Sequence, residues 1–327
     1  MSNFRWGILG PGGIAQAFVD DLQLAPGHSI GAVGSRTLSK AQAFAELFPG
    51  AIAYGSYEEL VRDKEIDAIY VATPHPMHLE HTLLALKAGK PVLCEKPFAI
   101  SAKQAQLMID TARENKVALL EAMWTRYLPH IATVREILNA GTLGQIQTVE
   151  ADHGQRLADR NIPRLMDPAL GGGALLDLGI YPVSFLHLVL GTPTHITARA
   201  VMTDRGVDAQ TSAIFDYADG VQGVINTTMV AQTPCRAVIS GLLGRLEIDT
   251  TFYNPTSMRV VLFDGTVTEY PNSYTGHGLR EQAIEMARVV RAGALESPLM
   301  PWDQTLEVMK SMDQLRAQIG LTYPFEN

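Results

Sequence analysis

The chain contains 327 residues, of which 46% are hydrophobic, and carries a formal net charge of −8 at pH 7. That length suits about two domains of ~150 residues, and the apolar fraction is high enough to bury a core in each. The negative charge argues against a nucleic-acid or anionic-membrane surface, which would need a clustered excess of Lys and Arg. No stretch reaches the ~18 uncharged apolar residues of a membrane span, and the first residues lack the apolar core of a secretory signal. We therefore expect a cytoplasmic globular protein whose partners are small molecules, with no nucleic-acid or membrane partner.

Short apolar runs alternate with amphipathic segments up to about residue 123. Apolar strands separated by such helices are typical of a parallel sheet that is covered on both faces. The predicted strands are residues 5–10, 29–35, 66–73, 91–96 and 117–123, and the predicted helices are residues 14–25, 38–48, 78–89 and 102–116. This pattern predicts that residues 1–123 form a doubly wound α/β domain.

The pattern changes after a predicted bridging helix at residues 128–139. Apolar and polar residues then alternate with a period of two, which indicates an antiparallel sheet. The predicted strands are residues 145–154, 195–203, 211–219, 221–230, 236–241, 244–249 and 258–265, and the predicted helices are residues 174–190, 279–293 and 306–319. We expect residues 124–327 to form a second, α+β domain, with the C-terminal helix able to pack back on the first domain.

A glycine-rich turn follows the first predicted strand. Gly10, Gly12 and Ala15 fit the pattern G-x-G-x-x-G/A where that strand turns into the first helix. Residues without a Cβ let a phosphate approach the backbone, and the helix N-terminus favours its negative charge. The turn therefore predicts a Rossmann-type dinucleotide site, with Gly13 and Ile14 also among its contacts. A glycine turn with only a structural role is the alternative.

The end of the second strand indicates which dinucleotide binds. A site for NAD usually has Asp or Glu here to bind the ribose hydroxyls, whereas this chain has Ser35, Arg36 and Thr37. Lys40 follows Arg36 by about one helical turn, so both cations could meet a 2′-phosphate. We predict NADP as the cofactor, with weaker binding of NAD. The alternative is an ordinary exposed helix start.

Histidines cluster after the next strand. Thr73, Pro74 and His75 lie at the carboxyl end of that strand, where open α/β sheets bind their ligands. With His78 they are expected in a loop beside the nicotinamide, whereas His81 is expected on the helix surface. The histidines suggest zinc, but no cysteine or suitably spaced ligand completes a tetrahedral set, so we expect no metal.

Two further pairs of polar residues carry the expected chemistry. Glu95 and Lys96 end the following strand at the same sheet edge, which makes this strand end the catalytic candidate. Asp177 and Tyr181 lie four residues apart on a predicted helix after three glycines and would share one face. A nearby ammonium would draw the pKa of the phenol toward the range of a general acid/base. A surface turn and a structural pair are the respective alternatives.

Together these motifs resemble a known family. The segments GPGGIA (residues 10–15), EKP (95–97) and GGGALLDLGIY (171–181) are similar, in order and spacing, to those of the family that contains glucose–fructose oxidoreductase and inositol dehydrogenase. They especially resemble its branch of dimeric dihydrodiol dehydrogenase and NADP-dependent D-xylose dehydrogenase. The resemblance covers nearly the whole chain. It implies a Rossmann domain followed by an open-faced, mainly antiparallel sheet, whose exposed face would join subunits of a homodimer or homotetramer.

The resemblance also implies residue roles. Lys96 matches the lysine that orients the substrate hydroxyl and assists proton transfer, and Glu95 matches a residue near the nicotinamide ribose. Tyr181 stands at the position of the acid/base tyrosine of the branch. Asp177 matches an aspartate that helps to hold substrate. The remaining residues expected to bind substrate are His75, Trp124, Arg126, His153, Tyr253 and His277. For Trp124 the alternative is a core position at the joint between the domains.

The substrate expectation depends on polar departures from the branch. His153 stands where the resemblance implies a phenylalanine in enzymes that oxidise aromatic diols, and Tyr253 where it implies a tryptophan. Polar groups left unpaired penalise an apolar ring, so we expect D-xylose or D-glucose to be preferred over a trans-dihydrodiol of benzene. Alternatively, His153 points away and pairs with Asp152 or Asp159.

The whole sequence therefore indicates an NADP-dependent dehydrogenase that acts on the CH–OH group of a sugar or vicinal diol. A reductase of a deoxy or anhydro sugar ketone is one alternative, because the same site serves both directions. A non-catalytic metabolite sensor that binds NADP is another, because fold alone does not establish turnover.

Overall fold

The computed structural model describes residues 3–160 and 162–326. The chain divides into two compact units. Unit 1 comprises Met1–Tyr127 and Gly276–Thr305, and unit 2 comprises Leu128–Thr275 and Leu306–Asn327. The division differs from the single boundary at residue 123 because residues 276–305 belong to unit 1.

The sheet of unit 1 is six-stranded, parallel and doubly wound, as predicted. Its strand order is β3-β2-β1-β4-β5-β6, so the order along the sheet reverses direction between β1 and β4. The strands are β1 (Phe4–Leu9), β2 (His28–Gly34), β3 (Ile52–Tyr54), β4 (Ala68–Val71), β5 (Val92–Glu95) and β6 (Leu119–Ala122). The helices are α1 (Gly13–Leu22), α2 (Leu38–Ala45), α3 (Tyr57–Arg62), α4 (His78–Lys87), α5 (Ala102–Asn115) and α9 (Arg280–Arg291), with short 3₁₀ turns η1 (His75–Met77) and η2 (Trp124–Tyr127). The sequence pattern did not predict β3, the shortest strand of this unit, or α3, its shortest α-helix.

Hydrogen bonds explain why residues 276–305 join unit 1. The buried carboxylate of Asp21 on α1 accepts the backbone N–H groups of His277 at 2.7 Å, Gly278 at 2.9 Å and Arg280 at 2.8 Å. Further along, the indole of Trp302 donates to the carbonyl of Leu119 at 2.8 Å. These partners are far apart in the sequence, so a local pattern could not reveal them.

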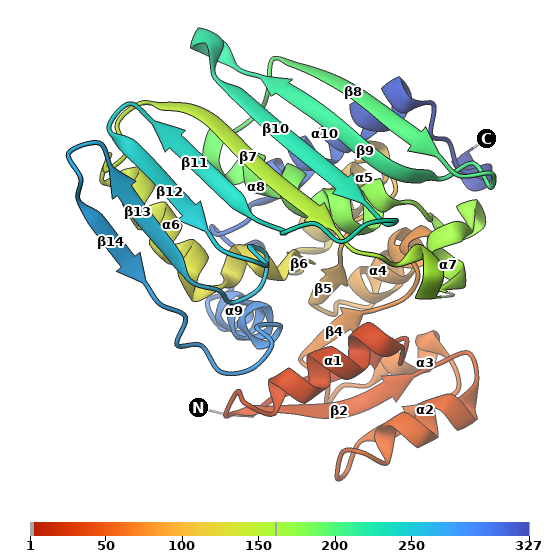
Figure 1. The fold of residues 1–327 in the computed structure, drawn as a ribbon. Helices are drawn as coiled ribbons and strands as arrows, with labels where there is room; N and C mark the ends of the chain where they lie inside the picture. Colours follow the sequence, from red (N-terminus) through yellow and green to blue (C-terminus); the bar gives the residue numbers. More distant parts are fainter. Residues whose placement is uncertain (1–2, 161, 327) are drawn as a thin grey trace. The chain divides into compact units, whose positions relative to one another are not determined.

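The sheet of unit 2 is eight-stranded, in the order β14-β13-β12-β11-β7-β10-β9-β8 (Figure 1). All neighbouring strands are antiparallel except β7 and β10. The strands are β7 (Ile146–Gly154), β8 (His195–Met202), β9 (Asp208–Asp216), β10 (Gln222–Thr228), β11 (Ala237–Gly241), β12 (Gly244–Ile248), β13 (Met258–Leu262) and β14 (Val267–Tyr270). The helices are α6 (Pro129–Asn139), α7 (Pro163–Met166), α8 (Ile180–Leu190) and α10 (Trp302–Ile319), of which α10 begins in unit 1. Short turns are η3 (Ala158–Arg160), η4 (Pro168–Leu170), the π-helical η5 (Leu175–Gly179), η6 (Ala218–Gly220) and η7 (Pro324–Glu326).

One face of this sheet is covered and the other is open. Helix α8 packs against β7 and β10. Along β9, Thr211, Ala213 and Phe215 are buried, whereas Ser212 and Ile214 between them are exposed. This alternation is what a half-buried strand requires. The expected open-faced, mainly antiparallel sheet is therefore confirmed.

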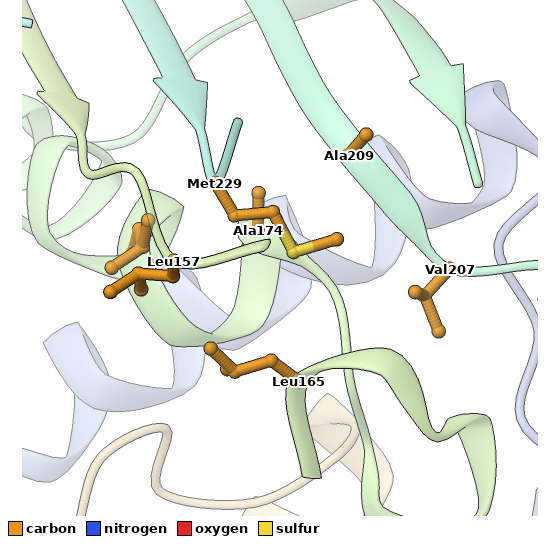
Figure 2. Packing of buried hydrophobic residues seen from close by; sticks show 7 residues of the cluster. Leu157, Leu165, Ala174, Val207, Ala209 and Met229 are labelled. Carbon is orange, nitrogen blue, oxygen red and sulfur yellow. The ribbon is translucent and has the colours of Figure 1, made fainter. Parts of the chain in front are cut away.

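A cluster of buried apolar side chains supports the start of η5 (Figure 2). Its members are Leu157, Leu165, Ala174, Leu178, Val207, Ala209 and Met229. Burial of a leucine- or methionine-sized side chain contributes roughly 1.5–3 kcal/mol each, so the cluster anchors the turn that carries Asp177.

One described segment, Pro168–Leu190, is long and apolar enough to cross a membrane by composition. Of its most apolar window, 83% is buried within the structure, as in the core helix of a globular domain.

Candidate active site

The glycine loop between β1 and α1 has the backbone that a bound phosphate needs. Gly10 has a φ of +94°, and a Cβ there would lie 2.7 Å from the Thr73 methyl carbon. Apart from the adjacent residues and the backbone of α1 itself, no described atom lies within 4 Å of where a Cβ on Gly12 or Gly13 would be, so the loop is open on that side. Among the residues described, no side chain caps the N-terminus of α1 and its first turn has no acidic residue. This terminus therefore suits an anion, and Ile14 lies beside it with 38% exposure.

Cationic and hydroxyl groups gather at the end of β2. Ser35 is buried, and its Oγ accepts the N–H of Thr37 at 3.2 Å. Arg36 and Lys40 are both exposed. The arrangement leaves two positive charges at the sheet edge that also holds the glycine loop.

The loop after β4 is held by its histidines. The ring nitrogens of the fully buried His78 lie 2.8 Å from the carbonyl oxygen of Thr73 and 2.9 Å from that of Pro97. Burial lowers the pKa of His78 to about 4, although the two carbonyls oppose that shift. The His78 ring thus connects the loop after β4 to the segment that follows Lys96. Its predicted contribution to the cofactor site would be to hold these two segments in position. His75, in η1, is buried and packs edge-on against His78 with ring centroids 5.8 Å apart.

The expectation that His81 lies on the helix surface is wrong. Its side chain is 6% exposed, and its Nδ1 lies 2.9 Å from Oγ1 of Thr73. Its ring also meets the Tyr57 ring edge-on at 4.6 Å. Within residues 3–160 and 162–326, no group of three or more His, Cys, Asp and Glu side chains is arranged to hold a metal ion.

Glu95 and Lys96 end β5 at the same edge. Glu95 is buried, and one carboxylate oxygen accepts the Tyr70 hydroxyl at 2.5 Å while the other accepts the Lys96 N–H at 3.3 Å. Tyr70 in turn stacks on Phe18 with ring centroids 4.0 Å apart. These contacts hold the backbone of the catalytic candidate in place.

Trp124 and His277 lie together in unit 1, although they are far apart in the sequence. Their ring centroids are 5.0 Å apart, and Asp21 holds the backbone of His277. Arg126 is different, because it is 1% exposed and donates to the side chain of Gln304 at 2.9 Å. Its guanidinium therefore helps to hold the start of α10, and its role with substrate stays a prediction.

Three rings form a cluster in unit 2. The His153 ring stacks on Tyr253 at 4.0 Å and meets Tyr181 edge-on at 5.1 Å, and the two tyrosine rings are 4.9 Å apart. His153 Nδ1 lies 3.1 Å from the Leu178 carbonyl oxygen, and the amide nitrogen of Gln155 lies 2.9 Å from His153 Nε2 and 3.0 Å from the Tyr253 hydroxyl. Burial raises the pKa of Tyr253, so its phenol stays protonated. This structure thus places His153 against Tyr181.

The carboxylates named as alternative partners of His153 have other contacts. Asp152 accepts the backbone N–H groups of Cys235 and Arg236, both at 2.9 Å. Asp159 pairs with Arg156 at 2.5 Å. The arrangement favours the interpretation in which His153 faces the tyrosines.

Asp177 and Tyr181 do not lie on a regular α-helix. Asp177 is within the π-helical η5, and Tyr181 is the second residue of α8. The Asp177 side chain is 8% exposed and pairs with Arg164 at 2.9 Å. Because a π-turn holds an extra residue, the spacing argument that placed both side chains on one face does not apply there.

Sequence reasoning missed several residues that position the candidate side chains of unit 1 and of unit 2. They are Asp21, Tyr57, Tyr70, Gln155 and Arg164. Gln155 carried a local signal, since it lies two residues after His153 and follows the end of the strand. The others act through partners that are distant in the sequence.

Comparison with known proteins decides the family. Residues 4–123 match the oxidoreductase family with an NAD-binding Rossmann fold, and residues 131–247 match the GFO/IDH/MocA C-terminal domain. The chain belongs to the GFO/IDH/MocA family of oxidoreductases. The resemblance drawn from the motifs is thus confirmed.

Relatives of this family member match it over both units. Trans-1,2-dihydrobenzene-1,2-diol dehydrogenase of Danio rerio is 38% identical over 331 residues, which cover 98% of each chain. D-xylose 1-dehydrogenase (NADP(+)) of Hypocrea jecorina is 36% identical, over 98% of this chain and 93% of the relative. Among solved structures, a 3-ketoreductase of Actinomadura kijaniata in complex with NADP and TDP-benzene aligns with a TM-score of 0.85 at 27% identity, covering 97% of this chain and 98% of that chain.

Proposed function

We propose that this protein is an NADP-dependent dehydrogenase that acts on a sugar or vicinal-diol hydroxyl. The observation that carries the proposal is the buried cluster in which the phenol of Tyr181 contacts His153 and Tyr253. A phenol among polar rings suits a group that hands a proton to or from a substrate hydroxyl. The similarity to dihydrodiol and D-xylose dehydrogenases supports the same chemistry.

The residues of unit 1 fit NADP. The open glycine loop from Gly10 to Gly13 would take the pyrophosphate at the N-terminus of α1, and Arg36 and Lys40 would bind the 2′-phosphate. Ser35 would add a hydroxyl to the same site, and Glu95 would lie near the nicotinamide ribose. When bound, the nicotinamide supplies the hydride chemistry. The lack of an acidic residue after β2 favours NADP over NAD.

The chain's own residues would orient the substrate and move its proton. In this proposal Lys96 and Tyr181 share the proton of the reacting hydroxyl, and Asp177 accepts hydrogen bonds from neighbouring hydroxyls. The Arg164 guanidinium donates to Asp177 at 2.9 Å and would orient the carboxylate, whose oxygens are acceptors. His75, Trp124, His277 and the His153 cluster complete the predicted substrate contacts.

We further propose that polyhydroxylated substrates are preferred over aromatic diols. The side chains of His153, Gln155 and Tyr253 present nitrogen and oxygen atoms where an aromatic substrate would prefer apolar rings. An apolar ring would make no hydrogen bond with these atoms, which pair with one another, whereas hydroxyls on successive carbons could bond to them.

A substrate panel tests the function. The purified protein would be assayed with NADP and NAD against D-xylose, D-glucose, inositol and a trans-dihydrodiol of benzene, by following the absorbance of the reduced nicotinamide. We expect NADP-dependent turnover and a higher kcat/KM for an aldose. In His153→Phe the ratio of kcat/KM values should move toward the aromatic diol. An unchanged ratio would contradict the proposed substrate preference but not the proposed reaction.

Two other functions make different predictions for the same panel. A reductase of a deoxy or anhydro sugar ketone would consume NADPH with the ketone and show little oxidation of aldoses. The fold similarity to a 3-ketoreductase is the reason to assay such ketones with NADPH as well. A non-catalytic sensor would bind NADPH without turnover of any substrate.

The remaining expectations concern the assembly and the cell. A homodimer or homotetramer formed through the eight-stranded sheet, and a cytoplasmic location, stay predictions. The open face of that sheet supports the first of them.

A further inference from the structure

Three glycines, residues 171–173, precede the turn that carries Asp177. The first backbone N–H groups of a helix have no partner inside the helix, and a side-chain oxygen of the residue just before it usually accepts one of them. Gly173 and Ala174 have no side-chain oxygen. The first N–H groups of this segment therefore need a partner from elsewhere in the chain.

Asp208, the first residue of β9, supplies that partner. Its Oδ2 accepts the N–H of Leu175 at 2.9 Å, and the hydroxyl of Thr211 donates to the same oxygen at 2.8 Å. Gly173 has a φ of +112°, and a Cβ there would overlap Oδ1 of Asp208. Asp208 thus caps the turn two residues before Asp177, from a position 33 residues away from Leu175 in the sequence.

A carboxylate suits this position. The positive end of the helix dipole favours a negative charge, and the Asp208 side chain is fully buried against it. Burial raises the pKa of Asp208 to about 6, although the hydrogen bonds from Thr211 and Leu175 oppose the rise. The group is therefore ionised in a mildly alkaline assay.

The C-terminal tail holds the same loop from another side. The hydroxyl of Tyr323, which is 1% exposed, donates to the carbonyl oxygen of Gly172 at 2.8 Å. The Tyr323 N–H donates to Glu326 at 3.0 Å, and the guanidinium of Arg316 lies 4.9 Å from the centre of its ring. Arg316, on α10, also donates to both carboxylate oxygens of Glu326, at 2.6 and 2.7 Å. The hydroxyl that holds Gly172 therefore has a fixed position.

Gly172 connects this contact to Asp177. A Cβ on Gly172 would lie 2.6 Å from the carbonyl oxygen of Leu165 and 2.8 Å from that of Arg164, so only a glycine lets the two segments approach this closely. The guanidinium of Arg164 donates to Asp177 at 2.9 Å. Movement of the glycine loop would therefore displace both partners of this ion pair.

We propose that Asp208 and Tyr323 are positioning residues for substrate binding, which hold the glycine loop so that Asp177 presents its carboxylate in one orientation. The inference rests on the proposed role of Asp177 in binding the hydroxyls of the substrate. It concerns unit 2, so we expect cofactor binding to unit 1 to stay unchanged.

The test separates KM from kcat in Asp208→Ala and Tyr323→Phe. The substrates would be D-xylose and, in a second series, the trans-dihydrodiol of benzene, each with saturating NADP. We expect KM to rise roughly three- to tenfold, because a helix cap or a hydroxyl bond is lost, and kcat to stay within about twofold of the wild type. A residue needed only for the fold would lower the amount of active enzyme, and hence kcat, without changing KM.

A double-mutant cycle tests whether the effect passes through Asp177. In the Asp177→Ala background, Asp208→Ala and Tyr323→Phe should have no further effect on KM, because there is no carboxylate left to orient. The dissociation constant of NADPH, measured by nicotinamide fluorescence, should stay at the wild-type level in all these variants.

Two further variants serve as controls. Asp208→Asn keeps an amide oxygen that can accept the N–H of Leu175, so its KM should stay within about twofold of the wild type. Asp264→Ala is the matched control, because Asp264 also belongs to unit 2 and accepts a backbone N–H, from Thr266 at 2.8 Å, in the turn after β13. Its KM should equal that of the wild type.

Hydrogen–deuterium exchange measures the loop without turnover. Residues 173–181 should exchange faster in Asp208→Ala and in Tyr323→Phe than in the wild type, whereas residues 183–190 of α8 should keep their protection. Tyr323→Phe keeps the ring that packs against Arg316, so this variant should fold even if Asp208→Ala does not, which circular dichroism checks.

The outcomes distinguish this inference from the proposed function. Unchanged KM and unchanged exchange in either variant would overturn the positioning role of that residue. A KM effect that persists in the Asp177→Ala background would show that it does not act through Asp177, and an equal effect in Asp208→Asn would exclude the hydrogen bond as its cause. A wild type that turns over neither substrate would overturn the proposed function, and the exchange alone would then decide whether the two residues hold the loop.

Discussion

The imidazole of His153 has one arrangement of protons that satisfies its neighbours. Nδ1 faces the carbonyl oxygen of Leu178, so it carries the hydrogen, and Nε2 accepts a hydrogen from the amide of Gln155. The second amide hydrogen of Gln155 goes to the oxygen of Tyr253. In this arrangement Gln155 links the His153 ring to the Tyr253 hydroxyl, and protonation of Nε2 would break the bond from Gln155.

The roles proposed for Lys96 and Tyr181 predict a non-additive pair of substitutions. Lys96→Ala and Tyr181→Phe should each lower kcat by at least ~10²-fold while the affinity for NADPH stays close to that of the wild type. Their combined effect should be smaller than the product, because both handle the same proton. Steady-state kinetics and nicotinamide fluorescence measure the two quantities.

Tyr217→Phe is the control for that experiment. Tyr217 also belongs to unit 2, and its buried hydroxyl has no hydrogen-bond partner among the described residues. Its removal should leave kcat unchanged. Near-normal turnover in Tyr181→Phe would remove this tyrosine from the mechanism.

At the scale of elements, the helix that carries Asp177 and Tyr181 departs from a regular α-helix for a local reason. Pro182 has no N–H to donate to the carbonyl of Leu178, four residues earlier. His153 Nδ1 occupies that carbonyl instead, at 3.1 Å. Asp208, which accepts the N–H of Leu175 at 2.9 Å, holds the first residue of the π-helical turn. The proline was visible in the sequence, but its two compensating partners were not.

Strand β6 buries an ionisable side chain. All four residues of β6 are buried, which suits the apolar centre of a parallel sheet, yet one of them is Glu121. Burial raises the pKa of Glu121 to about 7, and the nearby Thr305 side chain and the charge of Arg126 oppose the rise only in part. Neither carboxylate oxygen has a hydrogen-bond partner among the described residues. The strand therefore holds a carboxyl group that is more easily protonated in the folded chain than in the unfolded chain.

This shift predicts a pH dependence of stability. Between the unfolded pKa near 4.5 and the folded pKa of about 7, the folded chain binds more protons, so ionisation of Glu121 lowers the free energy of unfolding as the pH rises. Glu121→Gln removes this contribution. Relative to the wild type, the variant should gain on the order of 1 kcal/mol or more between about pH 5 and pH 8, measured by urea denaturation.

The exposed glutamate Glu114, at the end of α5, provides the control. Glu114→Gln should leave the difference from the wild type independent of pH. The same flat difference in Glu121→Gln would show that the buried carboxyl does not titrate in this range.

At the scale of the whole molecule, the open face of the eight-stranded sheet is the surface expected to join subunits. Ile214 and Val224 are paired across β9 and β10 and are 42% and 37% exposed. Cross-strand pairing extends this pair into a row on the same face of the sheet. The row continues through Glu150 on β7 to Glu247 on β12 and Arg259 on β13. An apolar pair beside charged residues suits a contact with an apolar centre and a polar rim.

The expected homo-oligomer therefore depends on this row. Ile214→Lys would place a charge at the apolar centre and should shift the protein toward the monomer, measured by size-exclusion chromatography with light scattering. Ile52→Lys is the control, because Ile52 is 46% exposed but belongs to the edge strand of unit 1. A wild-type mass in Ile214→Lys would exclude this part of the face from the subunit contact.

Local patterns in the sequence determined the two sheets and the edge that holds Gly10, Arg36, Thr73 and Lys96. Hydrophobic period and glycine turns act over a few residues, so they can be recognised in the chain without its fold. The short strand β3 and helix α3 were too brief to produce such a pattern, and α3 carries Tyr57.

Only the tertiary structure decided which side chains surround the candidate groups. His81 is buried against Tyr57, His153 contacts Tyr181 and Tyr253, and Asp21 holds the backbone of His277. The contacts of His153 and Asp21 join residues at least 28 positions apart in the sequence, the nearest pair being His153 and Tyr181. His81 and Tyr57 are closer in the sequence but lie on different helices. The physical reason is that packing and hydrogen bonding depend on distance in space, whereas the patterns readable in a single sequence report only on neighbours along the chain.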